Sequence, residues 1–206
     1  MKNNLIITIS REFGSGGREI GEKLAIELGI PYYDKIIIDK TAKETGFCAE
    51  FIEKEEQKVT SSLLFNLATN TYTFGNIMSQ NYGQSLSDQV FQAEAKVIKS
   101  LAAEGSCVIV GRCADYILKN QFPCFNVFIC ADFDKRCERA VAKYGIAKDD
   151  VKDVIKKTDK ARIRHNQFYG SQDWGDARNY DVTINSGTVG IDNAVQMLKA
   201  LIENYN

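Results

Sequence analysis

The chain has 206 residues, of which 44% are hydrophobic and 26% charged, and its formal net charge is −1. This length and composition are typical of one soluble globular domain, and a net charge near zero excludes an overall field that would attract nucleic acid or an anionic membrane. No apolar run reaches the length of a membrane span, and the start of the chain lacks a signal-peptide pattern. We therefore expect a cytoplasmic protein whose partners include neither nucleic acid nor a membrane.

The first elements are a strand, a glycine-rich turn and a helix. A β-branched run predicts a strand over residues 5–10, and apolar residues at helical spacing predict a helix over residues 17–28. Between them lie Gly14, Gly16 and Gly17, which let backbone N–H groups approach an anion at the positive end of the helix. We expect a phosphate or a nucleotide to bind here. The alternative is a tight turn without a ligand, at a high cost in backbone entropy.

This loop lacks the cation of the usual phosphate-binding motif. That motif, G-x-x-x-x-G-K-S/T, ends in a lysine and in a hydroxyl that holds magnesium. In this chain Gly16 is followed by Gly17, Arg18 and Glu19. Arg18 is the first candidate for the missing charge, because a guanidinium can hold two phosphate oxygens. The competing interpretation has Arg18 pointing to solvent or pairing with Glu22, four residues along the helix.

A second short strand is predicted over residues 30–34, and it ends in the carboxylate of Asp34. Together with the preceding strand and helix it forms a βαβ unit, which implies a parallel sheet. Residues 35–81 have no convincing strand pattern and are interpreted as a helical, solvent-facing insertion.

A clear amphipathic helix is predicted over residues 87–104, with Ser87 and Asp88 as its cap. A continuous apolar run then predicts a fully buried strand over residues 106–111. Arg112 follows directly, so we expect it just past the carboxyl end of that strand.

The rest of the chain alternates helices and strands. Helices are expected over residues 114–120, 134–143, 149–166 and 190–204, and strands over residues 125–131 and 180–185. Five strands separated by helices predict a doubly wound α/β fold, a three-layer arrangement around a parallel five-stranded sheet, in a single domain over residues 1–206. Ligands bind such sheets beyond the carboxyl ends of the strands. The glycine loop, Asp34, Arg112 and the pair Asn185 and Ser186 all fall at that edge.

The cysteines do not suggest a disulfide framework or a zinc site. No C-x-x-C pair occurs, and His165 is the only histidine. We expect reduced, mostly buried thiols at Cys48, Cys107, Cys113, Cys124, Cys130 and Cys137.

Several segments in this order resemble the nucleoside monophosphate kinases, and most closely their cytidylate kinase-like branch. Residues 6–40 resemble that family's strand, phosphate loop, helix and second strand, and residues 108–112 its strand ending in Gly-Arg. Arg136 and Arg139 match its Arg-x-x-Arg, and residues 159–162 have the spacing of its lid motif, Asp-Ser-x-Arg. The resemblance covers nearly the whole chain.

The resemblance implies a P-loop kinase with a helical acceptor-binding insertion at residues 40–86 and an arginine lid at residues 143–176. Its ligands would be small-molecule nucleotides: ATP as phosphoryl donor, with Mg²⁺ but without a dedicated protein metal site, and a pyrimidine monophosphate such as CMP as acceptor. Carried over residue by residue, the resemblance implies catalytic roles for Arg18, Arg112 and Arg162. The residues implied to bind the ATP phosphates are Gly14, Ser15, Gly16, Gly17, Arg18, Glu19, Arg136, Asn185 and Ser186. The residues implied to bind the acceptor are Asp34, Lys40, Arg112 and Asp159.

The chain also departs from the family pattern. The phosphate-loop lysine falls on Gly17 and the hydroxyl on Glu19, with Arg11 as a further cation near the loop. The family's Gly-Arg-Asp, whose aspartate helps to recognise cytosine, ends here in Cys113, and Asp115 is a candidate substitute. Further along, the family's acceptor-phosphate arginine is Lys40, and the serine of the lid motif is Lys160.

Two functions remain open at this point. The first is an active nucleotide kinase, favoured by the Gly-Arg pair and the lid motif. The second is a nucleotide- or phosphate-binding protein on the same fold, favoured by the lost lysine and hydroxyl.

Single residues also carry alternatives. Arg136 and Arg139 could bind phosphate or simply pair with neighbouring carboxylates on their own helix. Trp174 is either an aromatic anchor of its loop or a stacking partner near the nucleotide. His165 is interpreted as a helix-surface residue, because phosphoryl transfer needs no histidine.

Overall fold

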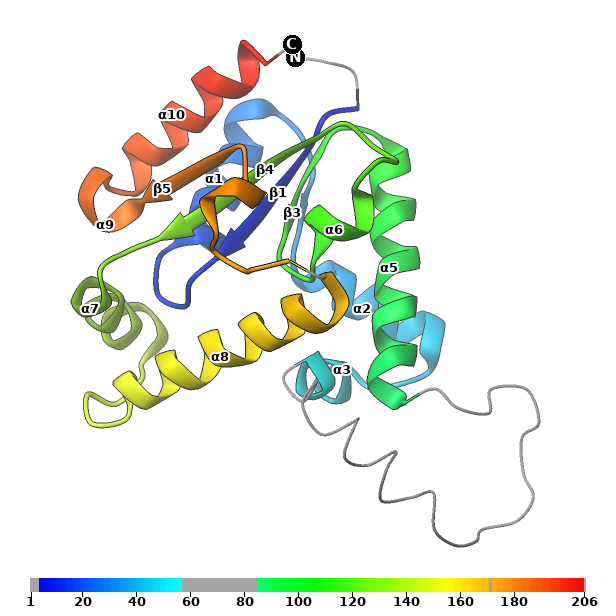
Figure 1. Ribbon diagram of the computed structural model, residues 1–206, viewed down its shortest axis with the longest axis horizontal. Coiled ribbons are helices and arrows are strands. Elements are labelled where there is room, and N and C mark those ends of the chain that lie inside the picture. Colours follow the sequence, from blue (N-terminus) through cyan, green and yellow to red (C-terminus); the bar gives the residue numbers. More distant parts are fainter. Residues whose placement is uncertain (1–3, 57–84, 171, 206) are drawn as a thin grey trace, which may run out of the picture.

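The computed structural model describes residues 4–56, 85–170 and 172–205. Within these ranges the chain forms one five-stranded sheet with the order β2-β3-β1-β4-β5, in which every strand pair is parallel (Figure 1). The strands are β1 (Ile6–Arg11), β2 (Tyr32–Tyr33), β3 (Cys107–Val110), β4 (Cys124–Cys130) and β5 (Val182–Asn185). The predicted doubly wound α/β fold is therefore confirmed.

Helices cover both faces of the sheet and bury its apolar side chains. On one face lie α1 (Gly17–Leu28) and α10 (Ile191–Glu203), which pack on Ile7 and Ile9 of β1. On the other face α5 (Leu86–Glu104) and α6 (Ala114–Leu118) pack on Ile6. The two-residue period of a strand accounts for this division, because successive side chains point to opposite faces.

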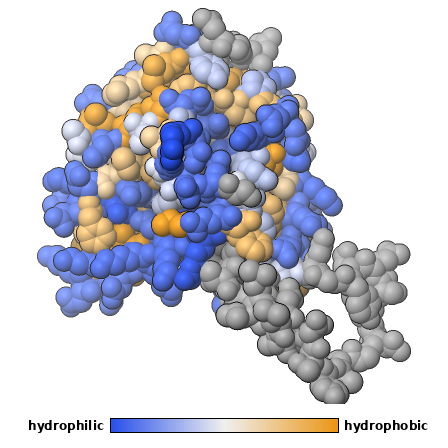
Figure 2. Space-filling view, viewed as in Figure 1, coloured by the Kyte–Doolittle hydropathy of each residue, from blue (hydrophilic) through white to orange (hydrophobic). Residues whose placement is uncertain are grey.

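The remaining helices lie around the carboxyl ends of the strands. Helices α2 (Lys35–Thr45) and α3 (Ala49–Glu56) pack beside α5. Helices α7 (Phe133–Tyr144) and α8 (Val151–Gly170) follow β4, and α8 runs across the end of the sheet (Figure 1). Its outward side is largely hydrophilic (Figure 2). The short 3₁₀ turn Ala177–Asn179 and α9 (Ser186–Val189) flank β5.

The main differences from the sequence prediction are at helix ends. The cap of α5 is Ser85, not Ser87 and Asp88: its hydroxyl accepts a hydrogen bond from the Asp88 N–H at 3.1 Å, and Asp88 accepts one from the Ser85 N–H at 3.3 Å. This is a capping box, so Asp88 is the third helical residue rather than the cap. Helix α8 continues four residues past the predicted end at Asn166.

The described part of the proposed insertion, α2 and α3, is helical as predicted; residues 57–84 lie outside the described residues. No helix among the described residues combines the length and the apolar composition that crossing a bilayer requires. All six cysteines lie in the described ranges and are thiols, but only Cys107 and Cys113 are fully buried. Burial raises the pKa of Cys107 to about 12 and that of Cys124 to about 11.

Candidate functional site

The glycine loop joins β1 to the first turn of α1 and has a backbone that only glycine fits. Gly14 and Gly16 have positive φ angles of 83° and 82°. A β-carbon on Gly14 would lie 2.7 Å from the carbonyl oxygen of Arg136, and one on Gly16 would lie 2.5 Å from Cδ1 of Ile191. The loop therefore packs tightly against α7 and α10, and it directs the amino end of α1 toward the edge of the sheet.

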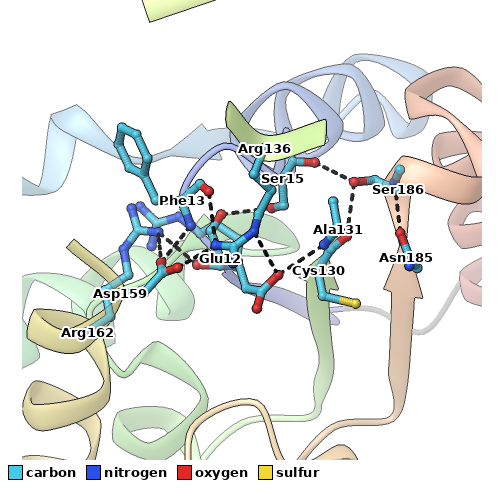
Figure 3. Close-up of polar contacts among 12 residues, drawn as sticks. Glu12, Phe13, Ser15, Cys130, Ala131, Arg136, Asp159, Arg162, Asn185 and Ser186 are labelled. Atoms are coloured by element: carbon cyan, nitrogen blue, oxygen red, sulfur yellow. Dashed lines mark hydrogen bonds and ion pairs between the residues drawn. The ribbon is translucent and has the colours of Figure 1, made fainter. Parts of the chain in front are cut away.

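The two residues predicted at the end of the last strand, Asn185 and Ser186, form hydrogen bonds that hold the loop and α9 in place. The hydroxyl of Ser186 donates to the carbonyl oxygens of Ser15, at 2.5 Å, and Cys130, at 3.1 Å (Figure 3). The side chain of Asn185 caps α9 by accepting from the N–H groups of Gly187 and Thr188. Asn185 and Ser186 thus make contacts that position the loop and α9, and neither lines the cavity described below.

Arg136 and Arg139 reach from α7 to the loop rather than pairing within their own helix. Arg136 donates to the carbonyl oxygen of Phe13 at 3.3 Å, and Arg139 forms an ion pair with Glu19. Burial raises the pKa of Glu19, but hydrogen bonds from Arg139 and Lys23 outweigh it, so the pKa is lowered. The local pairing considered from the sequence is therefore not what the structure contains.

The lid motif on α8 faces the same loop. Asp159 accepts a hydrogen bond from the Phe13 N–H at 2.7 Å and another from Arg136 at 2.5 Å (Figure 3). Arg162, one turn later, donates to the carbonyl oxygen of Arg11 at 2.9 Å. Asp159 was assigned to the acceptor from the family resemblance, but it lies against the loop and does not line the cavity.

A cavity of about 420 Å³ opens beside the loop, at the carboxyl ends of β1 and β3 and beneath α8. Its size is in the range of small-molecule sites. Among the described residues, its charged lining consists of five cations and two carboxylates: Arg11, Arg18, Lys35, Arg112, Arg162, Asp34 and Glu53. The excess of positive charge in this lining favours the binding of an anion.

Asp34 lies at the centre of this cluster, with a side chain that is only 4% exposed. Its carboxylate pairs with Nε of Arg18 at 2.5 Å and with Nη1 of Arg112 at 3.2 Å. Burial raises the pKa of Asp34, but the charges of Arg11, Arg112 and Arg18 lower it by more. The net effect is a lowered pKa, so the carboxylate stays ionised. Arg112 also contacts the buried Glu94 at 3.3 Å. The partner of Arg18 is thus Asp34, not Glu22.

The arginines are close enough to disfavour one another's charge. Burial and the neighbouring Arg11 lower the pKa of Arg162 to about 9, against the opposing effect of Asp159. Arg162 remains charged at neutral pH, but at a cost in free energy that a bound anion would remove.

The structure differs from the sequence prediction about which lysine of α2 reaches the cavity. Lys40 is exposed and does not line it, whereas Lys35, directly after Asp34, does. Asp115 does not line the cavity either: it is buried, it accepts a hydrogen bond from Gln172 at 2.7 Å, and burial raises its pKa. Asp115 therefore cannot take over base recognition in this arrangement.

The cavity wall also includes His165 and Trp174, and of these only His165 departs from the sequence prediction. His165 is buried, not on the helix surface, and its Nδ1 lies 3.2 Å from Sγ of Cys113. The spacing from Arg162 to His165, three residues on one helix, could have indicated a shared face. Trp174 fits both of its interpretations, because it packs edge-on against Phe128 at 5.1 Å and also lines the cavity.

Comparison with known proteins adds independent information. The chain is 24% identical, over all of its own length and 92% of the relative's, to a cytidylate kinase of Pyrococcus horikoshii. A solved structure of an uncharacterized protein from Eubacterium ventriosum has a TM-score of 0.72 and 29% identity, covering 97% of this chain and 99% of that one. Shikimate kinase from Bacteroides thetaiotaomicron shares the fold, with a TM-score of 0.55, 15% identity and coverage of 98% and 99%. The model of the cytidylate kinase-like family matches residues 6–188. The chain therefore belongs to the cytidylate kinase-like family.

Proposed function

We propose that this protein is a nucleoside monophosphate kinase that transfers the γ-phosphoryl group of ATP to a pyrimidine monophosphate, with CMP as the first candidate. The observation that carries the proposal is the cationic cavity directly beside the glycine loop. Two polyanions must meet in such a reaction, and this edge of the sheet offers a backbone cradle for one and a cluster of cations for the other. The choice of CMP rests on family membership and on the P. horikoshii relative.

In this reaction an oxygen of the acceptor phosphate attacks the γ-phosphorus of ATP. The bond from that phosphorus to the β–γ bridging oxygen breaks, and its electron pair leaves with ADP. The protein contributes alignment and neutralisation of charge rather than a covalent intermediate. We assign the donor phosphates to the backbone of residues 14–19, and the acceptor phosphate to Arg112 and Arg18. Arg162, on α8, contributes charge at the transferred group when the lid is closed.

Magnesium enters this proposal only with the donor, as MgATP. At the position of the usual hydroxyl the chain has Glu19, and its two carboxylate oxygens contact Arg139 and Lys23. Among the described residues no group of three His, Cys, Asp or Glu side chains could hold a metal ion. The residues present therefore do not fit a resident magnesium site.

The second candidate is a protein that binds nucleotide or phosphate without transfer. It is favoured by the carboxylate of Glu19 at the magnesium position, and by Asp159, which accepts the Phe13 N–H of the loop. Asp159 would compete with a donor phosphate for the Phe13 N–H, and Glu19 would compete with it for Arg139.

A substrate panel separates the two. Each nucleoside monophosphate is incubated with MgATP, and the products are resolved by ion-exchange chromatography. We expect ADP and a nucleoside diphosphate in equal amounts, with CMP the best acceptor. Binding of ATP without product from any acceptor would contradict the kinase and leave the binding protein.

A further inference from the structure

The side chain of Arg11 passes between two glycines on its way from β1 to the cavity. A β-carbon on Gly17 would lie 2.5 Å from the β-carbon of Arg11 and 3.0 Å from its γ-carbon. A β-carbon on Gly111 would collide with Nη1 of Arg11. Such distances are far below van der Waals contact, so Arg11 can lie as it does only because both positions lack a side chain.

Gly17 is the position at which the phosphate loop usually has its lysine. The stem of a lysine there would begin in the volume that the Arg11 stem occupies. The two side chains are thus alternatives: a chain can direct a cation to the edge of the sheet from the start of α1 or from the end of β1, but not from both without rearrangement.

The Arg11 side chain extends from the glycine loop to the neighbourhood of Arg112. Arg11 is the last residue of β1 before the loop, and its side chain lines the cavity. Its tip reaches Gly111, next to Arg112. Among the charges that lower the pKa of Asp34, that of Arg11 has the largest effect. The pKa of Arg162 is lowered most by burial, and among the neighbouring charges again most by Arg11. Its charge therefore acts on both the acceptor side and the lid side of the cavity.

We propose that Arg11 is the catalytic cation of this protein, replacing the phosphate-loop lysine from the opposite side of the loop, and that Gly17 is glycine to make room for it. This inference rests on the proposed function and assigns the lysine's role to a residue of β1. Arg18, the candidate from sequence, is 52% exposed and its Nε contacts Asp34, so its charge is directed to the acceptor side. Arg11 contacts the phosphoryl group in transfer and neutralises charge on its oxygens.

The experiment moves the positive charge from position 11, at the end of β1, to position 17, at the start of α1. Arg11→Ala removes the cation, and Arg11→Gly with Gly17→Lys removes the Arg11 β-carbon as well, so that the Arg11 volume is vacated and the usual lysine is restored. Arg11→Lys is the conservative variant, and Arg178→Ala, at an 86% exposed arginine outside the cavity, is the matched control. Each variant is assayed for transfer from MgATP and is titrated calorimetrically with inorganic tripolyphosphate, and thermal melting reports folding.

We expect Arg11→Ala to lower kcat about 10²–10³-fold, as loss of one transition-state donor does, and to weaken tripolyphosphate binding at least tenfold. The double variant should recover at least tenfold in both measurements over Arg11→Ala, Arg11→Lys should lie between Arg11→Ala and wild type, and Arg178→Ala should match wild type. A folded Arg11→Ala within threefold of wild type in both measurements would overturn the proposal. So would a folded double variant no better than Arg11→Ala.

The failure of this inference differs from the failure of the proposed function. If the wild-type protein transfers no phosphoryl group to any monophosphate, the proposed function fails, and tripolyphosphate affinity still decides whether Arg11 is the phosphate-binding cation. If the wild type is active and Arg11→Ala is equally active, only the role of Arg11 fails. If the double variant does not fold, Arg11→Ala and Arg11→Lys decide the question by the same two measurements.

Discussion

Charges are arranged differently on the two sides of the phosphate loop. On the side of α7, the carboxylates of Glu12, Glu19 and Asp159 meet Arg136 and Arg139 in ion pairs. In the cavity on the other side, five cations face two carboxylates among the described residues. The first group therefore has a carboxylate for each arginine, whereas the cavity lining has an excess of positive charge.

This difference suggests that the residues on the α7 side position the loop, whereas the residues of the cavity bind a substrate. Closed ion pairs fix the loop against α7 and α8 and have little charge left for a substrate. Burial, and to a smaller extent the neighbouring charge of Arg11, disfavours the charged form of Arg162 and lowers its pKa. An anion in the cavity relieves this cost, so its binding free energy includes the repulsion that it removes. We therefore look for the acceptor phosphate in the cavity and not on the outer side of the loop.

The largest effect is expected at Arg112, which links the cavity to the core. Arg112→Ala leaves Asp34 and Glu94, with side chains 4% and 1% exposed, without their shared cation. Breaking a buried ion pair from one side costs about 3–5 kcal/mol, and loss of the cation should also lower kcat/KM by about 10²–10³-fold. Urea denaturation and the transfer assay measure the two effects. Unchanged stability would mean that the carboxylates find other partners and that the cavity charge is not needed for folding.

A smaller effect is expected on the side with closed ion pairs. Asp159→Asn keeps the shape of the side chain but removes its charge from Arg136. The expected cost is about 1.5–3 kcal/mol in free energy of unfolding, the range for hydrogen bonds to charged groups, together with faster hydrogen exchange in α8. Asp153→Asn, at an exposed position of the same helix, is the control. If both variants melt alike, Asp159 does not hold the lid to the loop.

The sequence was sufficient to predict the sheet and the edge at which the site forms. Apolar runs marked the strands, and the carboxyl ends of parallel strands meet at one edge, which brings Asp34 within 3.2 Å of Arg112 although they are 78 residues apart. The pairing of Arg139 with Glu19, 120 residues away, was not predictable in the same way. It depends on how α7 docks against the loop, and the pattern of apolar residues along a helix does not specify its long-range polar partners.

The same limit explains the errors at single side chains. His165 was interpreted as a helix-surface residue because phosphoryl transfer needs no histidine, but it lies on the face of α8 that lines the cavity, together with Arg162 and Asn166. Lys40 was chosen over Lys35 by matching a family position, whereas the start of α2 at Lys35 determines which of the two reaches the site. The glycines were more informative, because Gly17 and Gly111 leave the space through which Arg11 runs, but a glycine in a sequence does not identify the side chain that fills this space.

Acid should weaken the protein through Asp34. Because its folded-state pKa is lowered below the usual carboxyl value of 3.8, Asp34 contributes stability above that value. This contribution is lost as the pH falls through the folded-state pKa. We expect the free energy of unfolding to decrease below about pH 4, and the decrease to be shallower in Asp34→Asn, measured by urea denaturation at a series of pH values. Equal pH dependence in both proteins would show that other carboxylates account for the acid sensitivity.

The smallest effect is expected at His165, and it tests whether the cavity and the loop serve different substrates. Nδ1 of the imidazole lies 3.2 Å from Sγ of Cys113, and the ring lines the cavity. His165→Gln removes the ring while keeping a polar group, so it should raise KM for the acceptor by up to about tenfold, the equivalent of one hydrogen bond of about 1.4 kcal/mol. KM for ATP should stay within twofold, because the donor phosphates are assigned to the backbone of the loop. Arg164→Gln, exposed on the neighbouring position of α8, should change neither value. A parallel rise in both KM values would mean that the two sides of the loop do not divide the substrates between them, and the acceptor assignment of the cavity would then have to be abandoned.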